Sequence, residues 1–276
     1  MDWFSGEGGL RLAADLFGPD AGVPVLLLPG GGQTRHSWRR TGQRLGEAGF
    51  RAVALDLRGH GDSDRAPEGD YGYAWLVADI RAVADALGRP PVLVGASLGG
   101  KVALAAAGHA GIGRALVLVD TAPHVNADGV ARVRGILQAP PEGFASLEEA
   151  AGVVAANRGQ TAPPGAGERL RRTMRQDADG RWHWHWDPLF FSRDHRLGTA
   201  AALDYLEGAA RKLTVPALLI HGERSDVVDA HAITALRAVL PAVEVCAIPG
   251  AGHMVVGDHN DAFADALLDF LRRVAR

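Results

Sequence analysis

The sequence contains little of what would point to disulfide bonds, membranes or charged polymers. Cys246 is its single cysteine, so no internal disulfide can form, and its apolar surroundings indicate a small buried side chain. The formal net charge of −3 is too balanced to favour nucleic acid or an anionic membrane as a partner. No run of about 18 apolar residues could span a bilayer, and the N-terminus does not have the pattern of a signal peptide. We therefore expect a soluble, cytoplasmic protein whose partner is a small-molecule substrate; the sequence leaves the oligomeric state open.

Short apolar runs alternate with longer stretches of helical periodicity. Near-continuous apolar runs are typical of strands buried on both faces. They lie at Val25–Leu28, Ala52–Leu57, Val92–Val94, Ala115–Val119, Ala217–Ile220 and Val243–Ile248. Helices are predicted from the 3.6-residue period. They lie at Trp38–Ala48, Tyr73–Leu87, Leu98–Ala107, Ala230–Leu240 and Asp261–Val274. This alternation predicts an α/β fold with a mostly parallel, doubly wound sheet, preceded by a hairpin over Trp3–Phe17.

One long stretch interrupts the alternation. Between residues 123 and 212 no strand of the central sheet is apparent, and the pattern is mostly helical. Helices are predicted around Asp128–Leu137, Ser146–Ala156, Ala166–Gln176 and Thr199–Ala210. We therefore predict a core formed by residues 1–122 and 213–276, with a helical cap inserted over residues 123–212.

A serine within a glycine-rich turn is the strongest chemical signal. The run Val92–Val94 leads into Gly95-Ala96-Ser97-Leu98-Gly99, and helical periodicity follows. A serine in such a strand-to-helix turn has strained backbone geometry, and side chains at the glycine positions would crowd it. The turn lifts the Ser97 hydroxyl to the edge of the sheet and leaves the Leu98 N–H unpaired at the start of a helix. Ser97 is the predicted nucleophile and Leu98 one predicted oxyanion donor.

Three consecutive glycines, Gly30–Gly32, directly follow the first core strand. Glycines let backbone N–H groups approach a ligand closely. We therefore predict that the Gly31 N–H is the second donor to the oxyanion. A phosphate-binding loop is the alternative use of such a cluster, but the stretch contains neither Gly-Lys-Ser/Thr nor a Gly-x-Gly-x-x-Gly that opens a helix.

A serine nucleophile also needs a base and an acid that orients the base. His253 ends Pro249–His253, directly after the last apolar run, and Asp226 lies in the polar loop after the run before it. Both lie at the carboxyl ends of predicted parallel strands, on the same edge as Ser97. The order Ser, Asp, His is the one expected with this type of serine turn. We predict that Ser97, Asp226 and His253 form a catalytic triad.

Asp120 is a competing candidate for the acid. It also ends a predicted strand on the active-site edge, at Leu116–Val119. Asp226 is favoured because its polar loop has room to turn back toward His253. Asp120 instead follows its strand at once and precedes Thr121–Pro123, where its carboxylate could hold the exit turn toward the cap.

The motifs together resemble those of the α/β-hydrolase superfamily over nearly the whole chain outside the cap. Besides Gly95–Gly99, the stretches Asp56–Ser63 and Gly250–His253 are similar to a family turn and to its histidine loop. Gly30–Trp38 resembles the oxyanion region of esterase-like and haloperoxidase-like members. Pro29 is a departure, because many members have a histidine there that supports the oxyanion loop.

The resemblance implies a cofactor-free serine hydrolase without a catalytic metal. Haloalkane dehalogenases and epoxide hydrolases of this fold use aspartate as nucleophile, so a serine at position 97 argues against both activities. Carbon–carbon bond hydrolases commonly have tryptophan after the catalytic histidine, where this chain has Met254. We expect hydrolysis of a small to medium, largely apolar ester or lactone through an acyl-enzyme. Carbon–carbon bond hydrolysis, amide hydrolysis and perhydrolysis remain alternatives, as does a non-enzymatic ligand receptor on the same fold.

Several further residues have competing interpretations. Trp184 and Met254 are predicted to contact the substrate, although the alternating tryptophans around Trp184 could equally anchor the cap. His183 and His185 could begin a metal site, but no second cluster completes one. In Asp56–Ser63 we interpret Asp56, Arg58, His60 and Asp62 as structural side chains that brace the turn.

Overall fold

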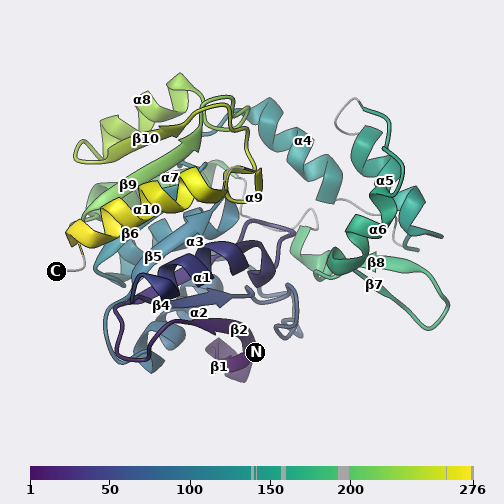
Figure 1. The fold of residues 1–276 in the computed structure, drawn as a ribbon, viewed down its shortest axis with the longest axis horizontal. Coiled ribbons are helices and arrows are strands. Elements are labelled where there is room, and N and C mark those ends of the chain that lie inside the picture. The colour runs from purple at the N-terminus through teal and green to yellow at the C-terminus, as the bar shows by residue number, and fades with distance from the viewer. Residues whose placement is uncertain (138–139, 141, 157–159, 192–198, 259, 275–276) are drawn as a thin grey trace.

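The computed structural model describes residues 1–276 except 138–139, 141, 157–159, 192–198, 259 and 275–276 (Figure 1). An eight-stranded sheet in the order β1-β2-β4-β3-β5-β6-β9-β10 forms its centre. β1 and β2 pair antiparallel, β2 pairs antiparallel with β4, and the strands from β4 to β10 run parallel. The strands are β1 (Asp2–Ser5), β2 (Arg11–Phe17), β3 (Pro24–Leu28), β4 (Arg51–Leu55), β5 (Val92–Ala96), β6 (Ala115–Val119), β9 (Ala217–Gly222) and β10 (Glu244–Ile248). The predicted α/β-hydrolase fold with a mostly parallel sheet is confirmed.

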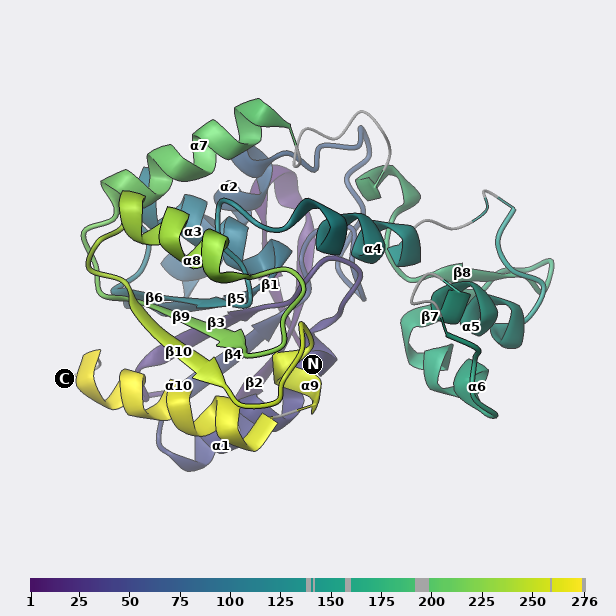
Figure 2. The same cartoon turned by 90° about the horizontal axis from the view of Figure 1, so that it is seen from above.

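Helices cover both faces of this sheet (Figure 2). α1 and α10 lie on one face, and α2, α3, α7 and α8 lie on the other. These helices are α1 (Arg39–Glu47), α2 (Tyr73–Ala86), α3 (Leu98–Ala110), α7 (Ala200–Lys212), α8 (Ala230–Val239) and α10 (Asn260–Val274). The short helix α9 (Val255–Asp258) precedes α10, and 3-10 turns span Glu7–Gly9 and Arg35–Trp38.

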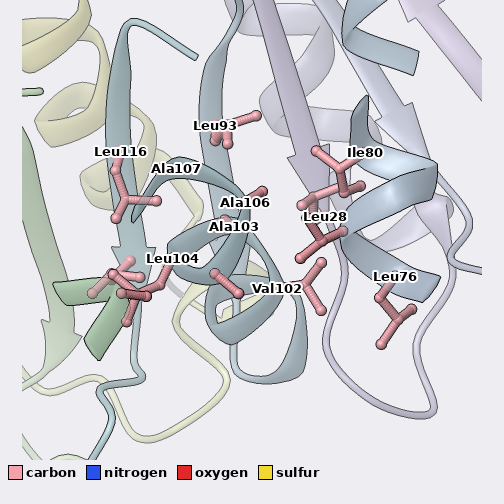
Figure 3. Packing of buried hydrophobic residues seen from close by; sticks show 14 of the residues in the cluster. Leu28, Leu76, Ile80, Leu93, Val102, Ala103, Leu104, Ala106, Ala107 and Leu116 are labelled. Carbon is pink, nitrogen blue, oxygen red and sulfur yellow. The ribbon is translucent and has the colours of Figure 1, made fainter. Parts of the chain in front are cut away.

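Each face of the sheet has its own apolar core. On the face of α3, small side chains such as Ala103 and Ala106 let the helix lie close to the sheet, among Leu28, Leu93 and Leu116 (Figure 3). On the opposite face, Trp38 and Phe263 pack with their ring centroids 6.0 Å apart. Burial on both faces explains why the central strands β3, β5 and β6 are apolar along their whole length.

The chain diverges at the centre of the sheet. β3 lies between β4 and β5; the chain leaves β3 toward α1 on one face and β5 toward α3 on the other. Such a topological switch point is where open α/β sheets hold their functional sites. The loops after β3 and β5, which contain Gly30–Gly32 and Ser97, meet there.

Between β6 and β9 the chain leaves the sheet, and we call residues 123–191 the insertion. It includes α4 (Ala127–Leu137), α5 (Leu147–Ala156) and α6 (Ala166–Leu170), which lie to one side of the sheet (Figure 1). A two-stranded hairpin, β7 (Met174–Gln176) and β8 (Trp182–Trp184), follows a 3-10 turn at Arg171–Thr173; a further turn spans Pro188–Phe191. The helix predicted over Ala166–Gln176 therefore ends early, and its last residues form a strand.

The predicted end of the cap at residue 212 is too late. α7 packs on α3 and contributes Leu206 and Ala209 to the main core. A Cβ at Gly108 of α3 would lie 2.0 Å from the Ala209 carbonyl oxygen, so the two helices touch backbone to backbone. Because α7 is part of the helical layer over the sheet, it belongs to the core and not to the insertion.

Candidate active site

Ser97 lies in the turn between β5 and α3, with a φ of 47°. This left-handed conformation is uncommon for a residue with a side chain and costs energy. A Cβ at Gly95 would lie 2.3 Å from the Gly99 carbonyl oxygen, and a Cβ at Gly99 would lie 2.4 Å from the Leu28 carbonyl oxygen. The turn therefore requires both glycines, as the sequence indicated.

His253 lies in the loop between β10 and α9, and its ring is bonded to Asp120 at the end of β6. The distance from His253 Nδ1 to Asp120 Oδ2 is 2.6 Å. Because a carboxylate accepts, Nδ1 carries the proton and Nε2 is left as the acceptor, which is the tautomer a general base needs. The side chain of Asp120 is 1% exposed and that of His253 is 16% exposed, so part of the histidine side chain remains accessible to solvent.

The structure contradicts the prediction that Asp226 orients His253. The carboxylate that is bonded to His253 belongs to Asp120. Asp226 is exposed in the loop before α8. The neighbouring Ser225 hydroxyl accepts hydrogen bonds from the Val227 and Val228 N–H groups, which turns the chain tightly at this point. Ser225 thereby faces the site, and the next residue along the chain faces solvent.

Ser225 is a site residue that sequence reasoning overlooked. Its hydroxyl donates to Asp120 Oδ2 over 2.6 Å, while the Gly222 N–H donates to Oδ1 over 2.9 Å. Together with His253 these groups give the buried carboxylate three donors. A backbone signal also marks the acid, because Asp120 and Ser97 are the two non-glycine residues with positive φ among those described. Neither feature can be read from the residue types alone.

The loop after β3 lies beside Ser97. A Cβ at Gly30 would lie 3.5 Å from Ser97 Cβ. The Gln33 side-chain oxygen accepts from the Gly30 N–H over 3.1 Å, and the Gln33 N–H donates to the Gly30 carbonyl oxygen over 3.0 Å. The second bond fixes the peptide plane that carries the Gly31 N–H. No acceptor for the Gly31 N–H is found among the described residues, and Leu98, as the first residue of α3, has no acceptor within the helix.

A pocket of about 90 Å³ lies at Ser97. It is lined by Gln33, Ser37, Trp38, Ala96, Ser97, Val119, His253, Met254, Val255 and Val256. The lining is mostly apolar, and among the described residues it includes no lysine, arginine or carboxylate. Met254, predicted to contact the substrate, is part of it, and its sulfur accepts from the Gln33 amide over 3.5 Å.

Trp184 lies elsewhere, in a core that belongs to the insertion. It is 6% exposed, stacks on Trp186 with ring centroids 4.8 Å apart and meets the edge of Phe144 at 5.8 Å. It does not line the pocket at Ser97. The structure therefore gives Trp184 a packing role within the insertion, and its contact with the substrate stays a prediction. Trp186, its neighbour, is the tryptophan that reaches the oxyanion loop, 3.1 Å from a Cβ built at Gly32.

The charged side chains of Asp56–Ser63 brace their turn, as interpreted from the sequence. Asp56 is fully buried and accepts from the Arg35 N–H over 2.6 Å and from the Arg35 guanidinium over 2.5 Å. Burial raises the pKa of the Asp56 carboxyl, and these donors oppose that rise. Arg58 forms a buried two-bond pair with Asp79. These charged side chains pair with one another inside the protein and do not face the pocket.

Within the described part of the chain, no three histidine, cysteine or acidic side chains are grouped as metal ligands would be. His183 pairs with Asp177 over 2.9 Å, and His185 is bonded to backbone groups. Across the same residues, no helix is long and apolar enough to cross a membrane.

Comparison with known proteins bears on the family and the fold. Residues 23–260 match the profile of the alpha/beta hydrolase fold family. The chain is 30% identical over 254 residues to an N-formylmaleamate deformylase from Pseudomonas putida, which covers 91% of this chain and 89% of that protein. It is 28% identical to a monoacylglycerol lipase from Mycolicibacterium smegmatis, over 92% and 90% of the two chains. The crystal structure of an E-2-(acetamidomethylene)succinate hydrolase superposes with a TM-score of 0.79 at 26% identity, over 98% of both chains.

Proposed function

We propose that this chain, which belongs to the α/β-hydrolase fold family and is a hydrolase, uses Ser97, His253 and Asp120 to cleave a small, largely apolar ester or lactone. The hydrogen bond between His253 Nδ1 and the buried Asp120 carboxylate, at the pocket that contains Ser97, carries the proposal. It holds the imidazole in the tautomer that can accept a proton from a serine hydroxyl.

The reaction would proceed in two steps. His253 Nε2 takes the proton of the Ser97 hydroxyl as its oxygen attacks the substrate carbonyl carbon, and the resulting oxyanion is held by the Gly31 and Leu98 N–H groups. The imidazolium then protonates the leaving oxygen, and an acyl-Ser97 ester remains. In the second step His253 takes a proton from water as the water oxygen attacks the acyl carbon. The imidazolium then returns this proton to Ser97 Oγ as the bond between Ser97 and the acyl group breaks and the acid is released. Asp120 stabilises the imidazolium in both steps.

The pocket favours a small, uncharged acyl group. About 90 Å³ of space is enough for a short acyl chain, and the lining around it includes apolar side chains such as Val119, Val255 and Val256. An ionised carboxylate of the substrate would meet no lysine or arginine among the described lining residues and would lose hydration without compensation. We therefore place the neutral acyl side of the substrate here.

Amide hydrolysis is the second candidate. The names of two relatives, an N-formylmaleamate deformylase and a 2-(acetamidomethylene)succinate hydrolase, refer to a formyl and an acetamido compound. Formyl and acetyl are the smallest acyl groups, which agrees with the volume of the pocket at Ser97. The same triad would perform this reaction, with the imidazolium protonating a leaving nitrogen.

A panel of chromogenic substrates tests the proposal. We would compare kcat/KM for p-nitrophenyl acetate, butyrate and octanoate, the matching anilides and a small lactone. We expect kcat/KM to fall at least about tenfold from acetate to octanoate, because the longer chain exceeds the pocket. The S97A variant is the control and should lose all but about one part in 10³ of the turnover. No turnover of any member, or S97A activity above about a tenth of wild type, would contradict the proposal.

A further inference from the structure

Gly32, the last of the three glycines in the oxyanion loop, is bonded on both sides to buried histidines. Its N–H donates to His60 Nε2 over 3.1 Å, and its carbonyl oxygen lies 3.4 Å from His185 Nε2. We propose that His60 and His185 are positioning residues that hold the oxyanion loop in its active conformation, and that His185 thereby makes this hold depend on the insertion. This inference rests on the proposed function, because it assigns the loop to oxyanion binding.

The partners of each ring determine its tautomer. His60 Nε2 faces an N–H and must accept, so its proton is on Nδ1, which lies 3.2 Å from the Arg58 carbonyl oxygen. His185 Nδ1 accepts from the Gly61 N–H over 2.8 Å, so its proton is on Nε2 and points at the Gly32 carbonyl oxygen. Each ring thus uses one nitrogen on the turn at residues 58–61 and the other on Gly32.

Both rings must be neutral for this arrangement, because an imidazolium cannot accept a hydrogen bond. Burial lowers the pKa of His60 to about 4 and that of His185 to about 3. Asp187 opposes this shift at His60 and Asp62 opposes it at His185, whereas Arg175 and His60 add to it at His185. At neutral pH both rings therefore keep one donor and one acceptor.

The segment that carries His185 is tied firmly to the same turn. The Asp187 N–H donates to the Gly59 carbonyl oxygen over 2.8 Å, and the Tyr71 hydroxyl donates to the Asp187 carboxylate over 2.6 Å. Phe190 meets the face of His60 edge-on, with centroids 4.5 Å apart. Short hydrogen bonds and packed rings thus fix the segment that carries His185 against the core, and His185 itself reaches the oxyanion loop at Gly32.

The surroundings of Gly32 leave no space for a side chain. Its φ is 71°, and a Cβ at this position would lie 2.2 Å from Leu137 and 3.1 Å from Trp186 of the insertion. The insertion therefore packs directly on the loop. The arrangement also answers the sequence departure at Pro29: this chain lacks a histidine there, and His60 and His185 support the loop from outside it.

Two variants of His185 test whether its ring positions the oxyanion loop or only attaches the insertion to the turn at Gly61. In H185Q the side-chain nitrogen can take the place of Nε2 and donate to Gly32, whereas in H185N the side-chain oxygen takes the place of Nδ1 and keeps only the Gly61 bond. We expect H185N to lower kcat about tenfold with KM within about twofold, and H185Q to keep kcat within about threefold of wild type. The inhibition constant of a trifluoromethyl ketone, whose hydrate mimics the oxyanion, should rise in H185N by the factor that kcat falls.

The outcomes are distinct. Equal losses in H185N and H185Q, a larger loss in H185Q, or no loss in either would overturn the inference while leaving the proposed function in place. Absence of wild-type turnover on the ester and anilide panel would overturn the proposed function and this inference together. If H185N does not fold by circular dichroism, the pair H60Q and H60N repeats the test, because only glutamine places an acceptor where Nε2 meets the Gly32 N–H. H60Q should then keep kcat within about threefold and H60N should lose about tenfold.

Discussion

Asp120 holds His253 through a 2.6 Å hydrogen bond from a position that is almost fully buried. Replacing its carboxylate with an amide keeps the size of the side chain but removes the charge that stabilises the imidazolium and selects its tautomer. We expect D120N to lower kcat by about 10⁴ at neutral pH, as the equivalent change does in a serine protease. Steady-state kinetics on the best ester, with circular dichroism to confirm folding, measures this.

Asp226 provides the matched control, because it is also an aspartate at the carboxyl edge of the sheet but is exposed. D226N should keep kcat within about twofold, as surface substitutions usually have small effects. A large loss of kcat in D226N together with a nearly unchanged kcat in D120N would reverse the assignment of the acid.

Residues that act through local sequence could be predicted, and residues that act through tertiary contact could not. Ser97 was identified because its neighbours must be glycine, and His253 because its loop has a characteristic sequence. The choice between Asp120 and Asp226 depended on which side chain turns toward the histidine. That direction follows from the Ser225 hydroxyl bonds to Val227 and Val228, which no spacing rule encodes.

Among the individual elements, β8 differs most from what the sequence predicts. Trp184 packs in the small core of the insertion beside Phe144 and Trp186, and its buried indole N–H has no acceptor among the described residues. We expect W184A to lower the free energy of unfolding by about 3 kcal/mol, because it leaves a large cavity. W184F, which keeps an aromatic ring and removes the unpaired N–H, should cost less than about 1 kcal/mol.

Chemical denaturation of the two variants measures this difference, and the ester panel is run in parallel. An unchanged midpoint in W184A together with a shifted chain-length preference would place Trp184 in the substrate pocket after all.

Strands and helices of the sheet layers were predictable because burial on both faces leaves an unbroken apolar run, and burial on one face leaves a period of 3.6. The elements of the insertion were harder to predict from the sequence. Met174–Gln176 continues a helical pattern but pairs with Trp182–Trp184 instead. α7 was assigned to the insertion because it adjoins it in sequence, and only its packing against α3 shows that it belongs to the core.

For the whole molecule, the switch point at the centre of the sheet brings the site together. The proposed nucleophile follows β5 and the proposed oxyanion loop follows β3, while the proposed acid and base follow β6 and β10. Because all these strands run parallel, residues far apart in sequence, such as Asp120 and His253, which are 133 positions apart, meet at one edge. The fold class followed from the alternation of elements, but the way the insertion contacts the oxyanion loop required the three-dimensional structure.

The central claim is that Ser97 becomes covalently acylated. Intact-protein mass spectrometry after rapid acid quench of the enzyme with p-nitrophenyl acetate, followed by peptide mapping, tests it most directly. We predict a single acetyl adduct on Ser97 that appears within the first turnover, is absent in S97A and accumulates in D120N only at a reduced rate. Turnover of the ester with no adduct on Ser97, or an adduct on another residue that persists in S97A, would contradict the account.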